Sequence, residues 1–233
     1  MRRYLIVDDN RAFGENLAEI LEDQGAEVAV VSGGESALVV VAQTRFDALV
    51  TDMRMPVMGG AELVQRIRRI DPGLPAVVIT AYTDAQDLAA ARKEGLLAVL
   101  PKPAPIGMLI ELLAVARRDG LVALVEDDRH LADNLCEILR CKGFSAVTAA
   151  SVSETERLDN GLEPFVALCD LRVPGGPDGE ALRQLAAKFP RLPLLVITAY
   201  AASFSVAEEK LFTKPFDVDA LLATIEGLYP AAA

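Results

Sequence analysis

The sequence predicts an α/β fold that is built twice, with one doubly wound, five-stranded parallel sheet in each half of the 233 residues. Three observations predict it. The pentapeptide VITAY occurs at 78–82 and again 118 positions later, at 196–200. Short, nearly all-apolar segments alternate with segments of helical periodicity, as in parallel sheets covered on both faces. Polar residues recur at the ends of the same apolar segments in both halves. A duplicated domain accounts for all three observations.

Within the first half, apolar segments such as YLIV, VAVV and AVVIT have the length of strands. Between them lie amphipathic segments. Phe13, Leu17, Ile20 and Leu21, for example, have the i, i+4, i+7, i+8 spacing of a buried helix face, and apolar residues repeat it 118 positions later. Five strand–helix units make a flavodoxin-like sheet, in which ligands bind at the carboxyl ends of the strands. We expect strands at about 4–8, 27–31, 46–52, 76–80 and 97–101, and helices at about 11–23, 35–43, 60–70, 84–94 and 105–118.

The repeat also predicts the domain boundaries, at 1–118 and 121–230, with 119–120 as a short linker. Gly120 is suited to end the last helix of the first domain. The joint lacks a Ser/Gly or Pro-rich tether, so we expect a fixed or narrowly hinged domain pair. The lysine of the pair KP repeats after 112 positions rather than 118, which means that the second copy is truncated by six residues between Thr198 and Lys214. We expect its fourth helix to be shortened or absent.

Composition excludes several classes of protein. The net charge of −11 is opposite to that of a nucleic-acid binder, so neither nucleic acid nor an anionic membrane is an expected partner. The longest apolar runs are strand-sized and too short for a membrane span, and the start MRRYLIVDDN is too short for a secretory signal. Cys136, Cys141 and Cys169 are odd in number and lack metal-type spacing, which favours buried thiols in a reducing cytoplasm.

Acidic residues are the most informative of the polar residues at the strand ends. Carboxylates that meet at one edge of a sheet repel each other, so the edge favours a divalent cation with oxygen ligands, and Mg²⁺ fits this description. In the first half the strand-end residues are Asp8, Asp9, Asp52, Thr80 and Lys102, with Arg54 beside them; in the second half they are Glu126, Asp127, Asp170, Thr198 and Lys214, with Arg172.

An acidic pair, a D-x-x-x-P segment, TA and KP, in this order and at strand ends, resemble the receiver (CheY-like) domains of two-component response regulators. The resemblance covers about 1–118 and 121–228. It implies a phosphoacceptor rather than an enzyme: Asp52, and Asp170 in the second copy, would take a phosphoryl group from a phosphohistidine on a kinase or histidine phosphotransfer protein. It implies that Asp8, Asp9, Asp52 and the Arg54 carbonyl hold Mg²⁺, that Lys102 supplies a cation, and that Thr80 bonds the phosphoryl group. In the second copy Glu126, Asp127, Asp170, Arg172, Thr198 and Lys214 would have these roles.

The expected output is altered association with a downstream protein or output domain, with a homodimer as one possibility. Val99 and Leu211 stand three residues before the lysines, where many receivers have an aromatic side chain, so we expect no large rotamer switch. Tyr82 and Tyr200 are expected at the mouths of the pockets, where they would tune phosphate lifetime together with Arg54 and Arg172. Because of the truncation, we expect the second copy to use its signalling face differently, against the first copy or another partner.

Simpler interpretations exist for each residue. Asp8, Asp9 and Asn10 suit a helix cap, Asp52 a turn, Thr80 an ordinary strand and Lys102 the solvent. His130 is expected to be solvated or capping, and Arg66, Arg68 and Arg69 to form a charged helix face.

Rival functions are a phosphorylation-independent scaffold with vestigial pockets and a metal-dependent phosphohydrolase. The second is disfavoured because Arg54 and Arg172 stand where its second acid is expected. A nucleotide-binding Rossmann module lacks its Gly-rich turn.

Overall fold

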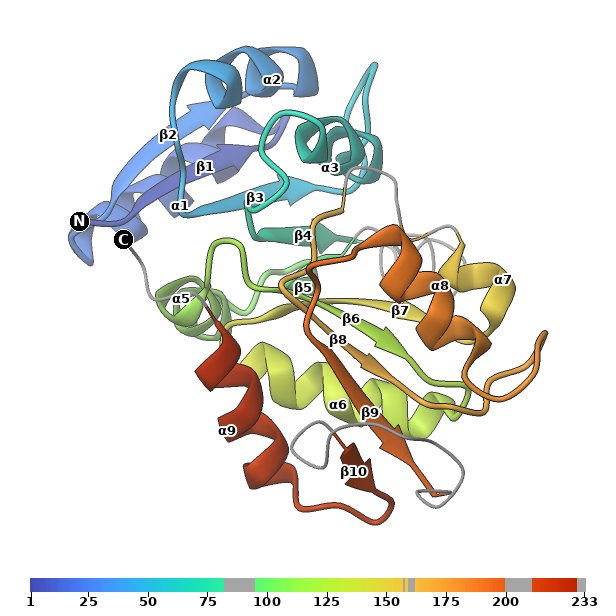
Figure 1. Ribbon diagram of the computed structural model, residues 1–233. Helices are drawn as coiled ribbons and strands as arrows, with labels where there is room; N and C mark the ends of the chain where they lie inside the picture. The colour runs from blue at the N-terminus through green and yellow to red at the C-terminus, as the bar shows by residue number, and fades with distance from the viewer. Residues whose placement is uncertain (82–94, 157, 159–161, 200–210, 230–233) are drawn as a thin grey trace.

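Two separate parallel sheets form the framework of the protein, as the computed structural model in Figure 1 shows. The structure describes all residues except 82–94, 157, 159–161, 200–210 and 230–233. The first sheet has the strand order β2-β1-β3-β4-β5 and the second the matching order β10-β9-β8-β6-β7. Every strand pair is parallel, so the prediction of two flavodoxin-like sheets is confirmed. The strands of the first sheet are β1 (Arg3–Val7), β2 (Glu27–Val31), β3 (Ala48–Asp52), β4 (Ala76–Thr80) and β5 (Ala98–Pro101); those of the second are β6 (Leu121–Val125), β7 (Ser145–Ala149), β8 (Val166–Cys169), β9 (Leu194–Thr198) and β10 (Leu211–Thr213).

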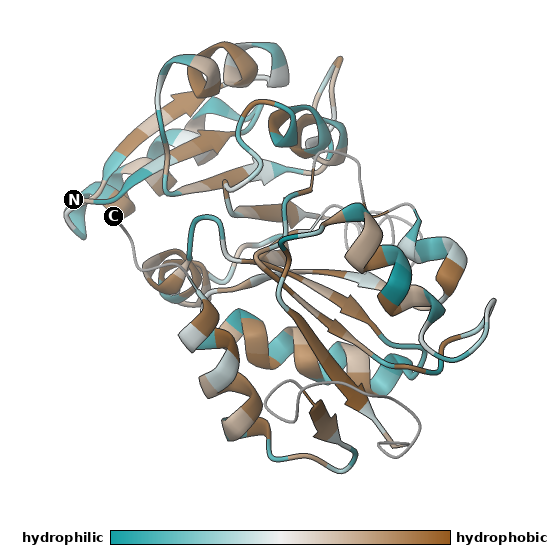
Figure 2. Cartoon of the chain, viewed as in Figure 1, coloured by the Kyte–Doolittle hydropathy of each residue, from teal (hydrophilic) through white to brown (hydrophobic). Residues whose placement is uncertain are grey.

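Helices cover both faces of each sheet. Because the central strands are buried on both faces, their side chains are almost all apolar, and Figure 2 shows most of the strands in the brown of hydrophobic residues. Each sheet has one core cluster on either face. The described helices of the first domain are α1 (Arg11–Asp23), α2 (Gly34–Gln43), α3 (Gly60–Arg68) and α5 (Ile106–Val115); those of the second are α6 (Arg129–Cys141), α7 (Val152–Thr155), α8 (Glu180–Lys188) and α9 (Val218–Leu228).

Two predictions fall outside the described residues. The whole of the helix expected at 84–94, and residues 200–210 of the truncated segment between Thr198 and Lys214, belong to them. Elsewhere the predicted elements agree with the structure to within one or two residues, except at the end of α5. That helix ends at Val115 and not near Arg118, because Ala116 is already extended (ψ 129°). Asp119, not Gly120, has the positive φ, of 57°. None of the described helices is long and apolar enough to cross a bilayer.

The prediction of a charged face on α3 was wrong for one residue. Arg68 is 3% exposed, and its guanidinium donates to the carbonyl oxygens of Pro72 (2.6 Å), Leu74 (2.7 Å) and Gly95 (2.8 Å). Carbonyl oxygens of three loop residues therefore accept hydrogen bonds from this buried guanidinium. This arginine holds the loop after α3 to the segment that leads into β5.

Two consecutive arginines lie at the joint, and their side chains bond different domains. Arg118 donates two hydrogen bonds to the carboxylate of Asp71 (2.6 and 2.7 Å) and a third to the carbonyl of Phe46, all in the first domain. Arg117 donates to Glu226 (3.2 Å) and lies 4.6 Å from the ring centroid of Phe144, both in the second. These bonds restrain the joint from both sides.

A second contact between the domains is made by α6. The Arg140 guanidinium, near the end of this helix, donates to the carbonyl of Leu97 (2.8 Å), directly before β5. The Arg117 backbone N–H also donates to the carbonyl of Gly143, which follows α6 (2.9 Å). The described contacts thus lie near the beginning of β5, the end of α5 and the end of α6.

Candidate functional site

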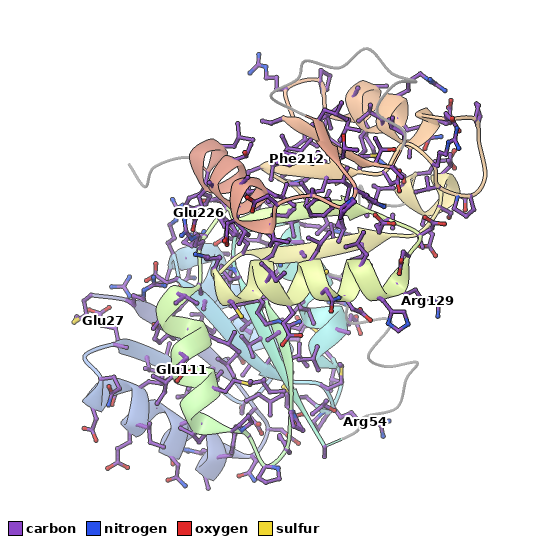
Figure 3. All side chains as sticks on the ribbon, turned by 90° about the horizontal axis from the view of Figure 1, so that it is seen from below. Glu27, Arg54, Glu111, Arg129, Phe212 and Glu226 are labelled. Carbon is purple, nitrogen blue, oxygen red and sulfur yellow. The ribbon has the colours of Figure 1, made fainter. Side chains whose placement is uncertain are left out.

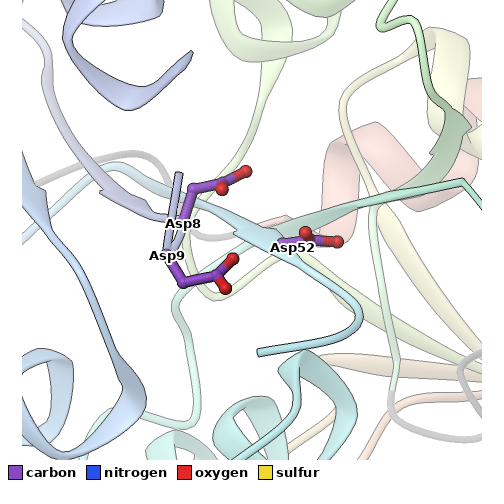
Figure 4. A group of neighbouring side chains, drawn as sticks. All are labelled: Asp8, Asp9 and Asp52. Carbon is purple, nitrogen blue, oxygen red and sulfur yellow. The ribbon is translucent and has the colours of Figure 1, made fainter. Parts of the chain in front are cut away.

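Three carboxylates meet at the carboxyl edge of the first sheet. Asp8 and Asp9 directly follow β1, Asp52 ends the neighbouring β3, and one oxygen of each lies within 4.8 Å of the others. Figure 4 shows these side chains at the adjoining strand ends. Asp8 is only 2% exposed, whereas Asp9 is exposed. Placing three acids so close together needs a compensating positive charge.

Lys102 supplies part of that charge. Its ammonium lies 2.7 Å from Asp52 Oδ2 and 3.1 Å from Asp8 Oδ2. Burial works to lower the pKa of Lys102, but the hydrogen bonds and charges of Asp52 and Asp8 outweigh it, and its pKa is raised above the ordinary value. One lysine against three acids leaves an excess of negative charge at this edge.

Thr80 and Arg54 lie beside this cluster. Thr80 ends β4, between the strands of Asp52 and Lys102, and its carbonyl accepts the backbone N–H of Lys102 (2.7 Å). The Arg54 backbone N–H donates to Asp52 Oδ1 (3.3 Å), so this carboxylate is held from two directions. Tyr82, predicted at the mouth of the pocket, lies outside the described residues, as does Tyr200 in the second domain.

The second sheet repeats the arrangement with different residues. Glu126, Asp127 and Asp170 offer oxygens within 4.8 Å of one another. The Lys214 ammonium lies 2.6 Å from both Glu126 Oε2 and Asp170 Oδ2. Burial raises the pKa of Glu126 despite the opposing effect of Lys214. For Lys214, burial acts to lower the pKa, but bonds to Asp170 and Glu126 leave it raised.

Neighbouring residues of the second site also repeat the first. The Arg172 backbone N–H donates to Asp170 Oδ1 (3.1 Å), and the Thr198 carbonyl accepts the backbone N–H of Lys214 (2.8 Å). In Figure 3, Arg54 and Arg129, which follow β3 and β6 and flank the two acidic clusters, point to the same side of the molecule, while Glu226 lies on the other side. Both acidic clusters lie at the carboxyl ends of strands, whereas the described contacts between the domains involve the residue before β5 and the residues after α5.

The capping interpretation is correct for part of the acidic motif. The Asn10 side chain caps α1 by accepting the Phe13 N–H (3.2 Å), and Asp128 caps α6 by accepting the N–H groups of His130 and Leu131. Asp8 and Glu126 lie inside the clusters instead. His130 is exposed, as predicted.

The loop after β3 brings backbone close to Asp52. A Cβ on Gly60 would collide with the Asp52 carbonyl, so the start of α3 fits only glycine here. Val57, in the same loop, has a φ of 69° and is 95% exposed. The second copy has Gly175 at the corresponding position, with a φ of 102°. Only one of these loops has glycine where the backbone is left-handed.

Sequence reasoning missed one neighbour of the first site. Phe13 was assigned to the buried stripe of α1, and its ring does pack against the core there. Its centroid, however, also lies 5.1 Å from Lys102 Nζ. The first copy has Phe13 where the second has Leu131, 118 positions later. This replacement is the signal in the sequence that the surroundings of the two lysines differ.

Comparison with known proteins agrees with this geometry. Residues 4–114 and 122–226 each match the family described as "Response regulator receiver domain". A response regulator receiver protein of Anaeromyxobacter sp. (strain Fw109-5) is 62% identical over 229 residues, which cover 98% of this chain and 96% of that protein. MprA of Mycobacterium ulcerans is 36% identical over 71% of this chain and 70% of its own length. FleR of Pseudomonas aeruginosa is 29% identical over 74% of this chain, but only 40% of its own length is matched.

Two solved receiver structures each cover about half of this chain. Chemotaxis protein CheY4 of Vibrio cholerae is 29% identical, with 49% of this chain and 97% of that chain covered and a TM-score of 0.47. A receiver protein of Pseudomonas putida is 28% identical over 48% of this chain and 94% of its own, also at 0.47. The two family matches together span most of the chain, so it belongs to the response regulator receiver domain family, carries two such domains in tandem, and takes part in two-component phosphorelay signalling.

Proposed function

We propose that Asp52 and Asp170 are the phosphoryl acceptors of this protein, each within a receiver domain bounded at 1–118 and 121–230. One observation carries the proposal: in both domains a lysine ammonium lies within 3.1 Å of the strand-end aspartate and of an acid that follows the first strand. The same charge arrangement is built twice from different residues, Asp8 in one domain and Glu126 in the other. Helix capping or solvation does not account for that repetition.

The acids fit a hard divalent cation such as Mg²⁺. All their ligand atoms are oxygens, and each cluster has three acids to one lysine. Asp9, Asp52 and the Arg54 carbonyl would hold the ion in the first domain, with Asp8 acting through water; Asp127, Asp170, the Arg172 carbonyl and Glu126 would do so in the second. When bound, the ion supplies neutralisation of charge on the transferred group.

The protein's own residues would act as follows. A carboxylate oxygen of Asp52 attacks the phosphorus of a phosphohistidine, so that a P–O bond forms as the P–N bond breaks and the electron pair returns to the imidazole. Lys102 is already within 2.7 Å of that carboxylate and donates to an oxygen of the arriving group. Thr80, at the end of the strand between them, offers its hydroxyl. The chain thus stores a phosphoryl group and turns none over beyond slow transfer to water.

The proposed donors are a histidine kinase or a histidine phosphotransfer protein, and the proposed output is altered association with a downstream protein. The end of α5 and the beginning of β5 contact the second domain, which supports a role for that domain in receiving the signal from the first.

The test is labelling by acetyl phosphate with Mg²⁺ in wild type, Asp52→Asn, Asp170→Asn and the double variant. Two phosphoryl groups per chain are expected by intact mass, one in each single variant and none in the double. If a single variant loses all label, only that aspartate is an acceptor. If wild type takes no label from acetyl phosphate and does not respond to beryllofluoride, the proposal fails and the scaffold alternative is favoured.

A further inference from the structure

We infer that Phe13 is a positioning residue for Lys102, and that the second domain holds Lys214 through its contacts with Glu126 and Asp170 instead. The inference rests on the proposed role of Lys102 at the phosphoryl site. Phe13 does not touch the reacting atoms; it acts through the lysine.

The geometry around Lys102 has two parts. Asp52 and Asp8 accept hydrogen bonds from the ammonium at 2.7 and 3.1 Å. The ring of Phe13, from the first turns of α1, has its centroid 5.1 Å from the same nitrogen, within the roughly 6 Å at which an aromatic ring attracts a cation. The lysine side chain remains 26% exposed, so it has room to swing toward solvent without the ring.

The repeat shows that the ring is not simply a core requirement. The position equivalent to Phe13 is Leu131, and the position two residues after the lysine is Ala104 in the first domain but Phe216 in the second. Phe13 and Ala104 pack against one core cluster, and Leu131 and Phe216 against its counterpart.

At this pair of positions the first domain has its aromatic ring on the first helix, and the second domain has it in the loop after the lysine. In the second domain that ring meets Phe212 edge-on, at 6.5 Å between centroids.

This exchange has a consequence for phosphoryl binding. An ammonium has three N–H donors, and the bonds to Asp52 and Asp8 use two of them. The third can bond a phosphoryl oxygen only while the nitrogen stays over the pocket. A ring beside the ammonium restricts the lysine before the phosphoryl group binds. The lysine then loses less conformational entropy on binding, which is preorganisation. Lys214, with Leu131 at the equivalent position, is held by its shorter contacts with Glu126 and Asp170 instead.

The experiment uses the full-length Asp170→Asn protein, so that only the first domain binds beryllofluoride in the presence of Mg²⁺. Three changes are compared. Phe13→Leu copies the second domain's helix, and Phe13→Tyr keeps the ring. Phe13→Leu with Ala104→Phe copies the second domain at both positions and keeps one aromatic ring between them. Ile20→Val, on the same helix and 36% exposed in the parent, is the control for changes in α1.

Phe13→Leu is expected to weaken beryllofluoride binding and slow labelling by acetyl phosphate by about threefold. Phe13→Tyr is expected to keep most of both, and the double exchange to recover the thermal midpoint but not the binding. Equal binding by Phe13→Leu and the parent overturns the inference, and so does full recovery in the double exchange, because packing volume alone then explains the effect. Failure of the parent itself to bind beryllofluoride overturns the proposed function as well.

Discussion

The two acidic sites of this chain share their layout, strand-end aspartate, threonine and lysine, but differ in several of the residues around them. Lys102 reaches a short acid, Asp8, at 3.1 Å, whereas Lys214 reaches the longer Glu126 at 2.6 Å. The Thr51 hydroxyl donates to the carbonyl of Asp52, and the thiol of Cys169 donates to that of Asp170. The comparison teaches that strand ends decide where functional groups lie, while the groups themselves can be exchanged for others that make the same contact.

The domains differ more away from these sites. Helix α2 has ten residues, and its counterpart α7 has four. The first domain places Val57 in a left-handed conformation for which the second has Gly175. Sheet and site are thus alike in the two copies, while the covering elements and loops are not. The four predictions below each compare two residues whose surroundings differ.

The largest difference is expected between the rates at which a reagent modifies two thiols of this protein. Cys169 is fully buried, and burial, followed by the charges of Asp170 and Glu126, raises its pKa to about 12; Cys141 is exposed. A thiol reagent at pH 8 should modify Cys141 at a rate on the order of 100-fold faster than Cys169. The raised pKa favours the folded state below about pH 9, and this contribution is lost as the pH rises through 12. Peptide mass spectrometry measures each site, and similar rates in the native protein would contradict the burial.

Removal of either lysine should have the next largest effect. Lys214→Ala leaves Glu126, with a side chain 1% exposed, beside Asp170 without its cation. Breaking such a pair costs about 3 kcal/mol, at the low end because the lysines are 20–26% exposed. Lys102→Ala should cost less, since its contact with Asp8 is longer. Urea unfolding with and without Mg²⁺ measures both: added ion should restore part of the loss. Lysine variants as stable as wild type at neutral pH would show that the pairs are not important for stability.

Removing the side-chain bonds of Arg118 at the joint should lower the free energy of unfolding by about 2 kcal/mol. Arg118→Ala removes the charged bonds to Asp71 and the bond to Phe46, in a side chain that is 14% exposed. The matched control is Arg45→Ala, because the Arg45–Asp119 pair is long (3.4 Å) and exposed, and such pairs contribute little. Small-angle scattering should show a broader distribution of domain separations for Arg118→Ala only. An unchanged distribution would mean that the other contacts suffice to fix the pair.

The smallest effect is expected in the loops. Val57→Gly should stabilise the protein by about 1 kcal/mol, because a β-branched residue is strained at a φ of 69° and the side chain, 95% exposed, buries little. Gly175→Val should have the opposite sign. A Cβ there would meet Val152 at an ordinary 3.5 Å, so the cost is conformational. Chemical denaturation measures both, and a destabilised Val57→Gly protein would refute the strain argument.

The strands and their ends could be predicted because both depend on short-range pattern. Short all-apolar segments that alternate with segments of helical periodicity indicate covered strands, and parallel strands bring residues such as Asp8 and Asp52 to one edge. Repetition then identified the second set of residues without any structure.

The rest depends on contacts that local pattern does not contain. Arg68 was assigned to a charged helix face together with Arg66 and Arg69, but the structure buries it, and its guanidinium donates to loop carbonyls such as that of Gly95, which is distant in sequence. The early end of α5 likewise reflects the joint, where Arg117 turns to the carbonyl of Gly143 and the next residue to Asp71. The ring of Phe13 was visible as an apolar residue but not as a neighbour of Lys102.

Helix α6 connects the second acidic site with the joint. It begins at Arg129, directly after its N-cap Asp128 and the acids of the second site. Near its other end, Arg140 donates a hydrogen bond to the carbonyl before β5, the strand that leads to Lys102. Thirteen helical residues span about 20 Å as one stiff rod. A tilt of α6 at one end therefore moves its other end. The second acidic site and the contact with the first domain are thus mechanically coupled through this helix.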